Sequence, residues 1–344
     1  MTKMPDPLQA VTHQNPTATY EQLAAQPFHF SSSLQGWLAT APKDIAAVLE
    51  DPRCRVRPLH QPVPTLLTGS MAGEIFSLLA RMTDGELHHQ VKESLLWELD
   101  TLSEQEVKRQ TEAAAHSLRS ETPLEFAYQM PVRSMALLLG IPMTDMEQLT
   151  ALMKKFAVCI TPGGPADGLQ EGIRAAPALW QLMEKRLPSA FAPALAQKVG
   201  VANAIGLLWQ SYDSTASLIL HGLLALEQQP LPADWDGFLT ELVRTTTPIQ
   251  NTRRFMAENG ILLDQNVREG DTLLLILAVA NLNTTGAGFS FGHGIHHCPG
   301  QRLSFLITKT ALTFWQHFRT TTKLMHSGFK SSINARIPLL EEVL

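Results

Sequence analysis

The sequence predicts a mainly α-helical protein with a minor β region. Three observations support this fold class. Long segments carry apolar residues at helical spacing, strand-like segments are few and short, and no internal repeat or low-complexity tract occurs. The 344 residues suffice for one large domain or two small ones, and no segment has the composition of a linker. We therefore expect a single domain over residues 1–344, with about residues 1–20 poorly ordered.

The predicted elements follow from local patterns. Residues 28–40 alternate loosely and predict a short hairpin. Residues 42–49 predict a helix that ends before Asp51-Pro52, and 55–73, with three prolines and two glycines, predict a long loop. From about Ala72 the sequence becomes helical, with helices that begin at the capping boxes Ser103/Glu106 and Thr144/Glu147 and a break at 163–165. Further helices are expected over 123–139, 201–226, 235–245 and 303–318. Strand-like sequence covers 253–263 and 272–279.

The composition excludes several classes of protein. Hydrophobic residues at 44% and charged residues at 17% are typical of a globular protein. The 27 basic and 32 acidic side chains give a net charge of −5, so neither nucleic acid nor an anionic membrane is expected as a partner. The N-terminus lacks the apolar segment of a secretion signal, and the longest apolar run, Leu273 to Ala280, is too short to span a bilayer. The three widely spaced cysteines favour a reducing compartment, and we expect a cytoplasmic protein.

The most informative segment contains three glycines, then Cys298, then the start of a helix. Glycines permit positive φ angles and close approach of the backbone to a flat ligand. We expect Cys298 at the helix N-cap with Pro299 at the first helical position, so that the sulfur faces the free N–H groups of Gly300 and Gln301. This setting favours a thiolate. The residues alone leave open a nucleophile, a zinc ligand together with His296 and His297, a haem ligand and a structural cysteine.

The segment as a whole resembles the haem-binding signature of the cytochrome P450 family. The matched positions are Phe291, Gly292, Gly294, His296, Cys298, Gly300 and Leu303. The resemblance implies that haem b is the cofactor and that the Cys298 thiolate is the axial ligand of its iron. It also implies that His296 hydrogen-bonds a haem propionate and that Phe291 and Gly300 belong to the haem site.

Further matches lie upstream, in the order in which the family carries them. Glu241 and Arg244 resemble the family's ExxR motif, a buried ion pair that fastens its helix to the region beneath the haem. Arg254, with Glu258 after it, resembles the arginine that binds a propionate, and Arg253 is the alternative.

Two more matches bear on the haem and its distal side. His88 and Lys92 resemble a His and Arg pair that contacts the propionates, with Lys in place of Arg, which keeps the charge but loses the bidentate fork. Asp213 and Ser214 match the acid–alcohol pair of the central helix, where a hydroxyl can bond back to the backbone and loosen a turn. By the resemblance, this pair relays protons to bound dioxygen.

The chain departs from the family in three places. Only nine residues separate Asn281 from Phe291, and the stretch from Ser214 to Glu241 is also short. We therefore expect a cytochrome P450 fold that is shortened in the meander and between the central helix and the ExxR helix. Gln210-Ser211 stands where relatives have small residues, so Gln210 could extend over the iron or hydrogen-bond a substrate.

The resemblance implies a haem-thiolate monooxygenase that oxidises a small organic substrate with dioxygen and two electrons. A ferredoxin- or flavodoxin-type protein is the expected electron donor, although the shortened meander lies on the face where such donors dock. Two alternatives remain: a haem enzyme that uses peroxide or catalyses a rearrangement, and a haem-binding sensor or carrier without turnover. We expect the substrate beneath residues 55–83 and near 248–252. The apolar candidates for its lining are Leu66, Leu67, Met71, Phe76 and Phe156.

Overall fold

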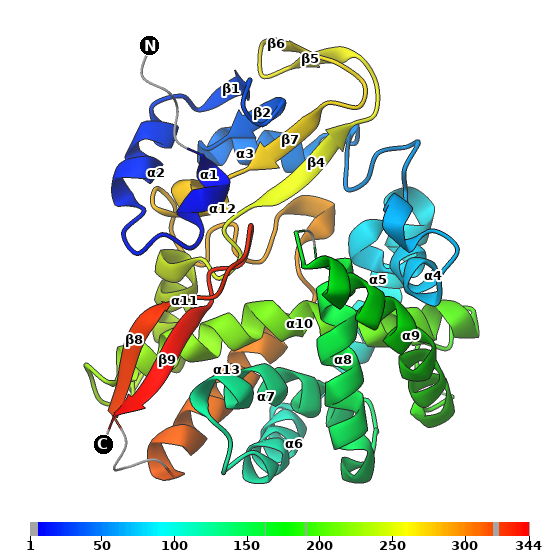
Figure 1. The fold of residues 1–344 in the computed structure, drawn as a ribbon, viewed down its shortest axis with the longest axis vertical. Helices are drawn as coiled ribbons and strands as arrows, with labels where there is room; N and C mark the ends of the chain where they lie inside the picture. The colour runs from blue at the N-terminus through cyan, green and yellow to red at the C-terminus, as the bar shows by residue number, and fades with distance from the viewer. Residues whose placement is uncertain (1–5, 162, 190, 319–322, 344) are drawn as a thin grey trace.

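The computed structural model describes residues 6–161, 163–189, 191–318 and 323–343. Most of this chain is helical, and its strands form a five-stranded sheet and two two-stranded hairpins. The helical part occupies the lower half of the molecule in Figure 1, and the five-stranded sheet lies above it. The mainly α fold with small sheets confirms the predicted fold class.

The helices vary from single turns to a central rod. They are α1 (Pro7–Ala10), α2 (Thr17–Ala24), α3 (Pro42–Glu50), α4 (Met71–Leu78), α5 (Gly85–Asp100), α6 (Glu104–Ser117), α7 (Pro123–Leu138), α8 (Met146–Ile160), α9 (Ala166–Arg186), α10 (Gln197–Leu226), α11 (Trp235–Thr246), α12 (Leu277–Asn281) and α13 (Gln301–Phe318), with the 3₁₀ turns η1 (Thr65–Leu67), η2 (Ala80–Met82), η3 (Met143–Asp145) and η4 (Gly294–His296). Within the described ranges, none of these helices has the length and apolarity needed to cross a membrane.

The five-stranded sheet joins two distant parts of the chain. Its strands are β1 (Phe28–Ser31), β2 (Gly36–Ala39), β7 (Thr272–Leu275), β4 (Thr252–Met256) and β3 (Cys54–Arg55), in that order. The hairpin β1–β2 pairs with β7 in parallel, and β4 pairs with β7 and β3 in antiparallel fashion. The sheet thus fixes the N-terminal strands against the segment that carries Arg253 and Arg254. The hairpins are β5 (Gly260–Leu262) with β6 (Gln265–Val267) and β8 (Lys323–Phe329) with β9 (Pro338–Val343).

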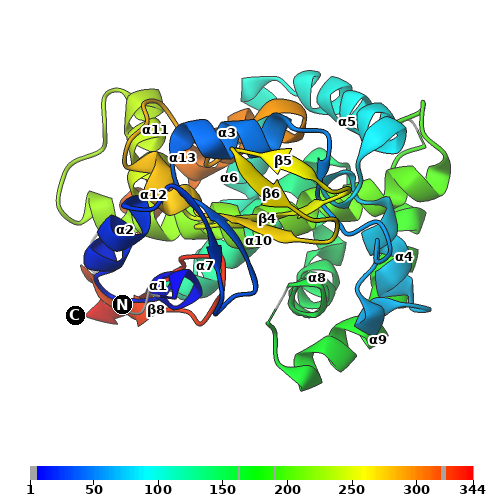
Figure 2. The same cartoon turned by 90° about the horizontal axis from the view of Figure 1, so that it is seen from above.

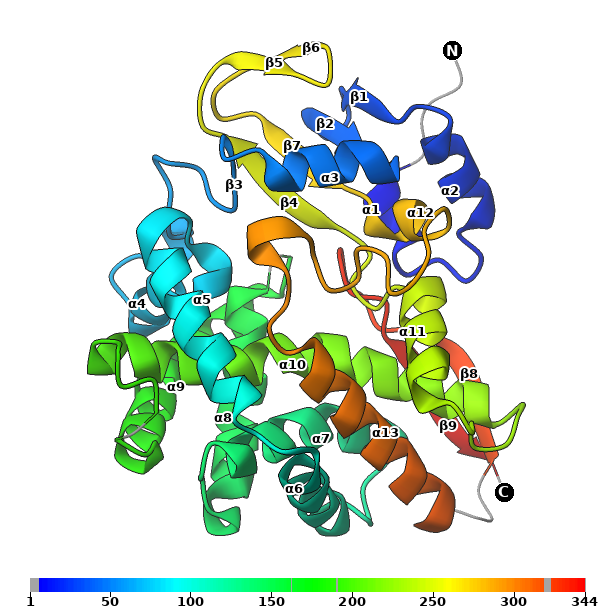
Figure 3. The ribbon, with the colours of Figure 1, turned by 180° about the vertical axis from the view of Figure 1, so that it is seen from behind.

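The central helix α10 is apolar on most sides because other helices surround it. It packs against α7 and α13, among others, and the sheet lies to one side of it (Figures 1 and 2). A Cβ atom at Gly222 would lie 2.5 Å from Cδ1 of Leu312 in α13, so only glycine permits this approach. Two turns earlier, the hydroxyl oxygens of Thr215 and Ser304 are 3.1 Å apart. The helices α10 and α13 therefore run side by side in a fixed register (Figure 3).

Most of the expected elements are present. The hairpin, the helices α3, α7, α10, α11 and α13 and the break before α9 lie where the sequence predicts them. Ser103 caps α6 by accepting from the N–H of Glu106 at 3.2 Å. The connection from α10 to α11 is eight residues long and contains no helix, which accounts for one of the two expected shortenings.

Other expectations differ from the structure. The Thr144/Glu147 capping box is wrong: α8 follows η3 directly, and Glu147 forms an ion pair with Arg133 at 2.5 Å. Strand sequence over 272–279 is correct only as far as Leu275, because the apolar run continues into α12, and short apolar runs do not distinguish strand from helix. In place of the poor order expected for about residues 1–20, the described part from residue 6 onward forms α1 and most of α2. Arg336 donates to the carbonyl of Val11 there.

Candidate functional site

The segment of residues 289–300, here called the cysteine loop, holds its shape through its glycines. Gly292 has a φ of +73°, and a Cβ there would lie 2.7 Å from the carbonyl oxygen of His296. Gly294 has a φ of +60°. The N–H of Cys298 donates to the carbonyl of Phe291 at 2.7 Å and closes the loop. These glycines are required by the backbone, as the sequence indicates.

Cys298 does not occupy the helix N-cap that the sequence predicts. The helix α13 begins at Gln301, and the N–H of Gly300 reaches the sulfur. A Cβ at Gly300 would lie 3.8 Å from the sulfur, within ordinary contact. Burial raises the pKa of the Cys298 thiol, while the Gly300 hydrogen bond and the charges of Arg81 and Lys92 act in the opposite direction. The charges of two side chains thus act on the Cys298 sulfur, and one backbone N–H donates to it.

The helix α5 is fastened to the cysteine loop through one carbonyl group. His88 is buried, with Nδ1 at 2.8 Å from the carbonyl oxygen of Ala80 and Nε2 at 3.1 Å from that of Ile295. Lys92 also donates to the carbonyl of Ile295. A neutral imidazole has only one N–H, so it cannot donate to both carbonyls at once. The predicted pair therefore lies at the loop that holds Cys298.

His296 has a protein partner of its own. Its Nε2 lies 3.2 Å from Oδ1 of Asp84, and its ring contacts that of His88 at a tilt of 48°, with centroids 4.1 Å apart. Burial lowers the pKa of His296, and the Asp84 hydrogen bond opposes this. Burial also raises the pKa of Asp84, but bonds from His296 and the N–H of Val56, with the nearby Arg55, hold that pKa below its ordinary value. Asp84 was not among the predicted site residues, because it stands at the N-cap of α5, where an aspartate is ordinary.

Two guanidinium groups near the cysteine lack a carboxylate partner. Arg254 is buried, its Nη1 donates to the carbonyl of Arg253 at 2.8 Å, and burial together with the charge of Arg81 lowers its pKa to about 10. Arg81 was not among the predicted site residues. The residue is exposed to solvent, but burial still lowers the pKa of its guanidinium, and the nearby Cys298 raises that pKa. This combination is expected of a side chain that faces a space enclosed by protein. No ion pair joins either arginine to an acid among the described residues.

These residues fit the implied cofactor. Haem presents a flat apolar face, an iron and two carboxylates, so its site needs small residues, an axial ligand and cations. The cysteine loop supplies glycines and Cys298, and Arg81, Lys92 and Arg254 supply cations, none of which has an ion pair with a carboxylate among the described residues. Phe291, predicted at this site, packs edge-on against Phe305 of α13 with ring centroids 5.4 Å apart.

Glu241 and Arg244 form the predicted ion pair, with Arg244 Nη2 2.6 Å from Glu241 Oε1. The pair is not buried as expected, because the Glu241 side chain is 61% exposed. Arg244 also donates from Nη1 to the carbonyl of Asn281 at 3.1 Å. Asn281 in turn accepts from the N–H of Phe289 and donates to Ser290. Arg244 thus connects α11 to the start of the cysteine loop, and Glu241 orients Arg244 from the solvent side.

The acid and the alcohol of α10 have different surroundings. The Ser214 hydroxyl donates to the carbonyl of Gln210 at 2.7 Å, which is the back-bond that the sequence predicts. The Asp213 carboxylate accepts from the Tyr128 hydroxyl at 3.3 Å and lies 4.0 Å from Nζ of Lys330. Burial raises the pKa of Asp213, and Lys330 and Tyr128 counteract it. Tyr128 and Lys330 have no motif and come from α7 and the end of β8, so sequence reasoning missed them.

One donor of the Gln210 amide is engaged within its own helix. Its Nε2 donates to the carbonyl of Gly206, one turn earlier in α10, at 3.1 Å. Ser211 donates likewise to the carbonyl of Leu208 at 2.8 Å. Both polar side chains are thus held by backbone groups of their own helix.

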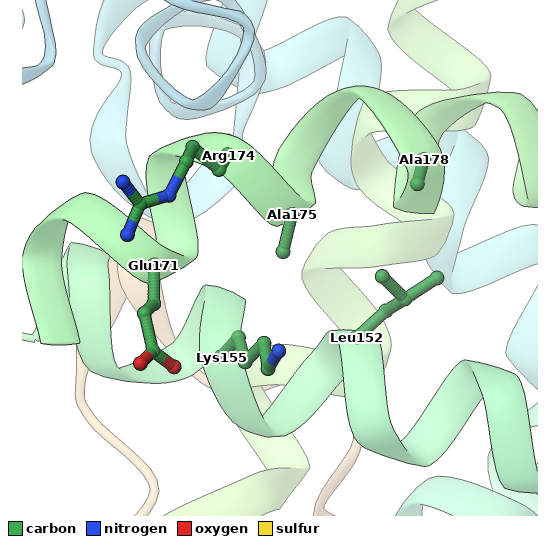
Figure 4. Close-up of a pocket in the computed structure, with 6 residues that line it drawn as sticks. All are labelled: Leu152, Lys155, Glu171, Arg174, Ala175 and Ala178. Atoms are coloured by element: carbon green, nitrogen blue, oxygen red, sulfur yellow. The ribbon is translucent and has the colours of Figure 1, made fainter.

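A pocket of about 390 Å³ lies between α8 and α9 (Figure 4). Its lining is Leu152, Lys155, Glu171, Arg174, Ala175 and Ala178. None of these residues belongs to the predicted site, and the mixed charges and small side chains do not converge on one ligand group. In the described part of the chain, no group of three or more His, Cys, Asp or Glu side chains is placed to hold a metal ion.

Comparisons with known proteins point to one family, although no family model matches the chain. The vitamin D(3) 25-hydroxylase of Pseudonocardia autotrophica is 28% identical over 226 residues, which are 55% of this chain and 55% of that protein. The cytochrome P450 monooxygenase PikC of Streptomyces venezuelae is 25% identical, with 87% of this chain and 82% of PikC covered. P450BioI, solved in complex with an acyl carrier protein ligated to hexadec-9Z-enoic acid, has the same fold with a TM-score of 0.79 at 20% identity, and the match covers 95% of this chain and 97% of P450BioI.

The fold and these relatives agree with the motifs that the cysteine loop, α10 and α11 carry in family order. The chain belongs to the cytochrome P450 family and is a P450-type monooxygenase.

Proposed function

We propose that the chain forms one haem-thiolate domain over residues 1–344, binds haem b through the Cys298 thiolate, and oxidises a small organic substrate with dioxygen and two electrons. Family membership implies the haem cofactor. The observation that supports Cys298 as the ligand is its position in a glycine-shaped loop, where the N–H of Gly300 donates to its sulfur and the charges of Arg81 and Lys92 lower its pKa against the effect of burial. When bound, a haem with a thiolate ligand would supply the chemistry of dioxygen activation, because the thiolate favours cleavage of the O–O bond.

The residues around the cysteine would hold the haem carboxylates. Arg254 and Arg81 are the strongest candidates, because each is a guanidinium without an acidic partner among the described residues. Lys92, His88 and His296 lie beside them, already joined to the loop or to Asp84. A carboxylate here would accept charge-assisted bonds in a poorly hydrated setting, where such bonds are strongest.

On the opposite side of the site, Asp213 and Ser214 would deliver protons. The Ser214 hydroxyl donates to a carbonyl of its own helix. The Asp213 carboxyl accepts from the Tyr128 hydroxyl, which in turn accepts from Lys330. Because burial raises the pKa of Asp213, this carboxyl takes up a proton more readily than an exposed aspartate does. A carboxyl with a raised pKa is suited to proton transfer near neutral pH.

The ligand proposal is tested by the spectrum of the reduced, CO-bound protein. The wild-type protein should show the red-shifted Soret band of haem-thiolate proteins, and Cys298→Ser should abolish the band while haem stays measurable. Cys54→Ser and Cys159→Ser are matched controls, because both cysteines are buried and lie outside the cysteine loop. A wild-type protein that binds haem without this band would refute thiolate ligation.

The type of turnover is tested separately. Product formation with an electron donor and dioxygen is expected to exceed that with peroxide alone. The reverse order would assign a peroxide-using or rearrangement enzyme, and no turnover of any compound that shifts the haem spectrum would assign a sensor or carrier. A cytoplasmic location, a ferredoxin- or flavodoxin-type donor and the absence of membrane or nucleic-acid partners belong to the same proposal.

A further inference from the structure

Three arginines alternate along β3 and the residues next to it, and only two have an acidic partner. Arg53 pairs with Asp51 at 2.6 Å, and Arg55 with Asp84 at 3.5 Å. Arg57 has no carboxylate within ion-pair distance among the described residues. Its Nη2 donates only to the carbonyl oxygen of Gln61, at 3.0 Å. The chain thus neutralises two of these cations and leaves the third without a counter-ion.

Arg57 is enclosed in spite of its charge. Its guanidinium carbon lies 5.6 Å from the ring centroid of Phe76 in α4 and 5.7 Å from that of Phe255 in β4. Its Nε is buried and has no hydrogen-bond partner among the described residues. Burial lowers the pKa of this guanidinium. A buried donor without an acceptor costs about 1–3 kcal/mol, and more when it is charged. Such a group is expected where a ligand supplies the acceptor.

A second arginine shares this face of the sheet. Arg253 precedes Phe255 by two residues in β4, so both side chains leave the strand on the same face. Arg253 is half-buried, burial lowers its pKa, and its side chain makes no hydrogen bond or ion pair with the described residues. Arg254 leaves the strand on the opposite face, towards Arg81. Arg253 and Phe255 thus lie on one face of β4 and Arg254 on the other.

Arg57 lies in the segment that connects the five-stranded sheet to the helical layer. The chain passes from β3 in the sheet to α4 in the helical layer through the segment that carries Arg57 (Figure 3). The helix α4 packs on α10, where a Cβ at Gly206 would lie 2.8 Å from Cδ2 of Leu79. Phe76 is among the residues expected to line the substrate region. An anion held by Arg57 would therefore have apolar and aromatic side chains beside its uncharged part.

We propose that Arg57, together with Arg253, forms an anion-binding subsite for the substrate, which is an organic anion with an apolar body. This inference rests on the proposed function, because it identifies one end of the substrate of that enzyme. A guanidinium fork matches the two oxygens of a carboxylate, and it also binds phosphate. The free Nε of Arg57 and the unpartnered guanidinium of Arg253 supply the donors, and the rings of Phe76 and Phe255 contact the carbon chain.

The test uses three probes of equal chain length: dodecanoate, methyl dodecanoate and dodecyl phosphate. Their dissociation constants are measured by calorimetry on the protein as purified. At least one anion should bind about tenfold or more tightly than the ester, as expected for a charge-assisted bond to a buried guanidinium. A preference for dodecanoate over dodecyl phosphate assigns a carboxylate substrate, and the reverse assigns a phosphate. Equal affinity for acid and ester, or no binding of either anion, would overturn the subsite.

Substitutions identify the residues. Arg57→Gln should remove the preference for the anion and leave the affinity for the ester unchanged, and Arg57→Lys should retain part of the preference. Arg253→Gln should reduce it. Arg53→Gln is the matched control, because Arg53 has the same charge but is paired with Asp51 and stands nearer the surface. Circular dichroism confirms that each variant is folded. An unchanged preference in Arg57→Gln would refute the assignment.

Haem content separates this inference from the function on which it rests. Arg57→Gln and Arg253→Gln should retain haem and the reduced CO band of the wild type. Loss of haem from these variants would assign the two arginines to the haem carboxylates and overturn the subsite. If the wild type itself lacks the CO band but prefers the anion, the proposed function fails and the subsite stands.

Discussion

The cysteine loop and the middle of α10 both carry motifs, but they hold their side chains by different means. In the loop, the backbone does this: Gly292 adopts a positive φ angle, and the N–H of Cys298 closes on Phe291. In α10, Asp213 depends on Tyr128 and Lys330, which lie 85 and 117 positions away in the chain. Geometry that the local backbone fixes can be predicted from residue types. Geometry that depends on distant side chains cannot.

The largest effect is expected within the loop, at Gly292. Gly292→Ala forces an L-residue into the left-handed region and places a Cβ 2.7 Å from the carbonyl of His296. We expect the free energy of unfolding to fall by roughly 2–5 kcal/mol and haem uptake to fall with it. Gly286→Ala is the control, since Gly286 has a φ of +61° but open space around it, and should cost only about 1–2 kcal/mol. Equal losses in urea unfolding would show that the contact with His296 is unimportant.

Asp84→Asn tests how far the loop depends on a partner outside it. We expect a loss of about 1–3 kcal/mol at pH 7, because the carboxylate accepts from His296 and Val56 and faces Arg55. The pKa of Asp84 is lowered in the folded protein. Its contribution is therefore present above the ordinary aspartate pKa of 3.8 and is lost as the pH falls through the lower folded value. Urea unfolding from pH 7 downward should show the two proteins converging, and a constant difference would contradict this.

Asp213→Asn should act on stability in the opposite direction. Burial raises the pKa of Asp213, so the charged form of this carboxyl at neutral pH is less favourable in the folded protein than in the unfolded chain. Removal of the charge should raise the free energy of unfolding at pH 7 by up to about 1 kcal/mol. This gain should disappear below pH 3.8, where the carboxyl is protonated in both states. Oxygen-dependent turnover should fall by roughly 10²-fold.

Tyr128→Phe is the companion to that variant. It removes a hydrogen bond that holds down the pKa of Asp213, so the acidic limb of the pH–rate profile should shift to higher pH. Phenylalanine retains the ring that packs at a tilt against that of Tyr212, with centroids 4.6 Å apart. An unchanged profile would mean that Asp213 does not relay the proton.

The smallest effect is expected at the ExxR pair. Glu241 is exposed, so Glu241→Gln should leave the unfolding midpoint unchanged within error. Arg244→Gln should lower it, because Arg244 also donates to the carbonyl of Asn281. A larger effect for Glu241→Gln than for Arg244→Gln would reverse the roles assigned to the two residues.

The residues that could be predicted share one property: their structural role requires particular residue types at neighbouring positions in the sequence. Cys298, Gly292 and Ser214 lie in short motifs whose backbone form is required. Arg81 lies in the 3₁₀ turn η2 and Asp84 at the N-cap of α5, where an arginine or an aspartate is ordinary, and only the fold brings them to Cys298 and His296.

The same reasoning applies to the elements. The helix α9 and the hairpin β8–β9 are absent from the expectations. Pro177 lies inside α9, where a proline counts against a helix, and a register shift between His326 and Gly328 interrupts the alternation of β8. The exposure of Glu241 was also not predicted, because the packing of α11 in the fold decides which of its faces is left open to solvent. Neither feature can be read from composition or spacing.

The fixed register of α10 and α13 has a consequence for motion. Contacts at Thr215–Ser304 and Gly222–Leu312 are about two turns apart on both helices, so neither helix can slide or tilt without breaking one of them. Ser214 and Cys298 lie next to this braced pair and cannot move independently of it. Opening of the protein to admit a substrate must then come from the other side, where α4, α8 and α9 pack on α10, and hydrogen exchange should be fastest in those three helices.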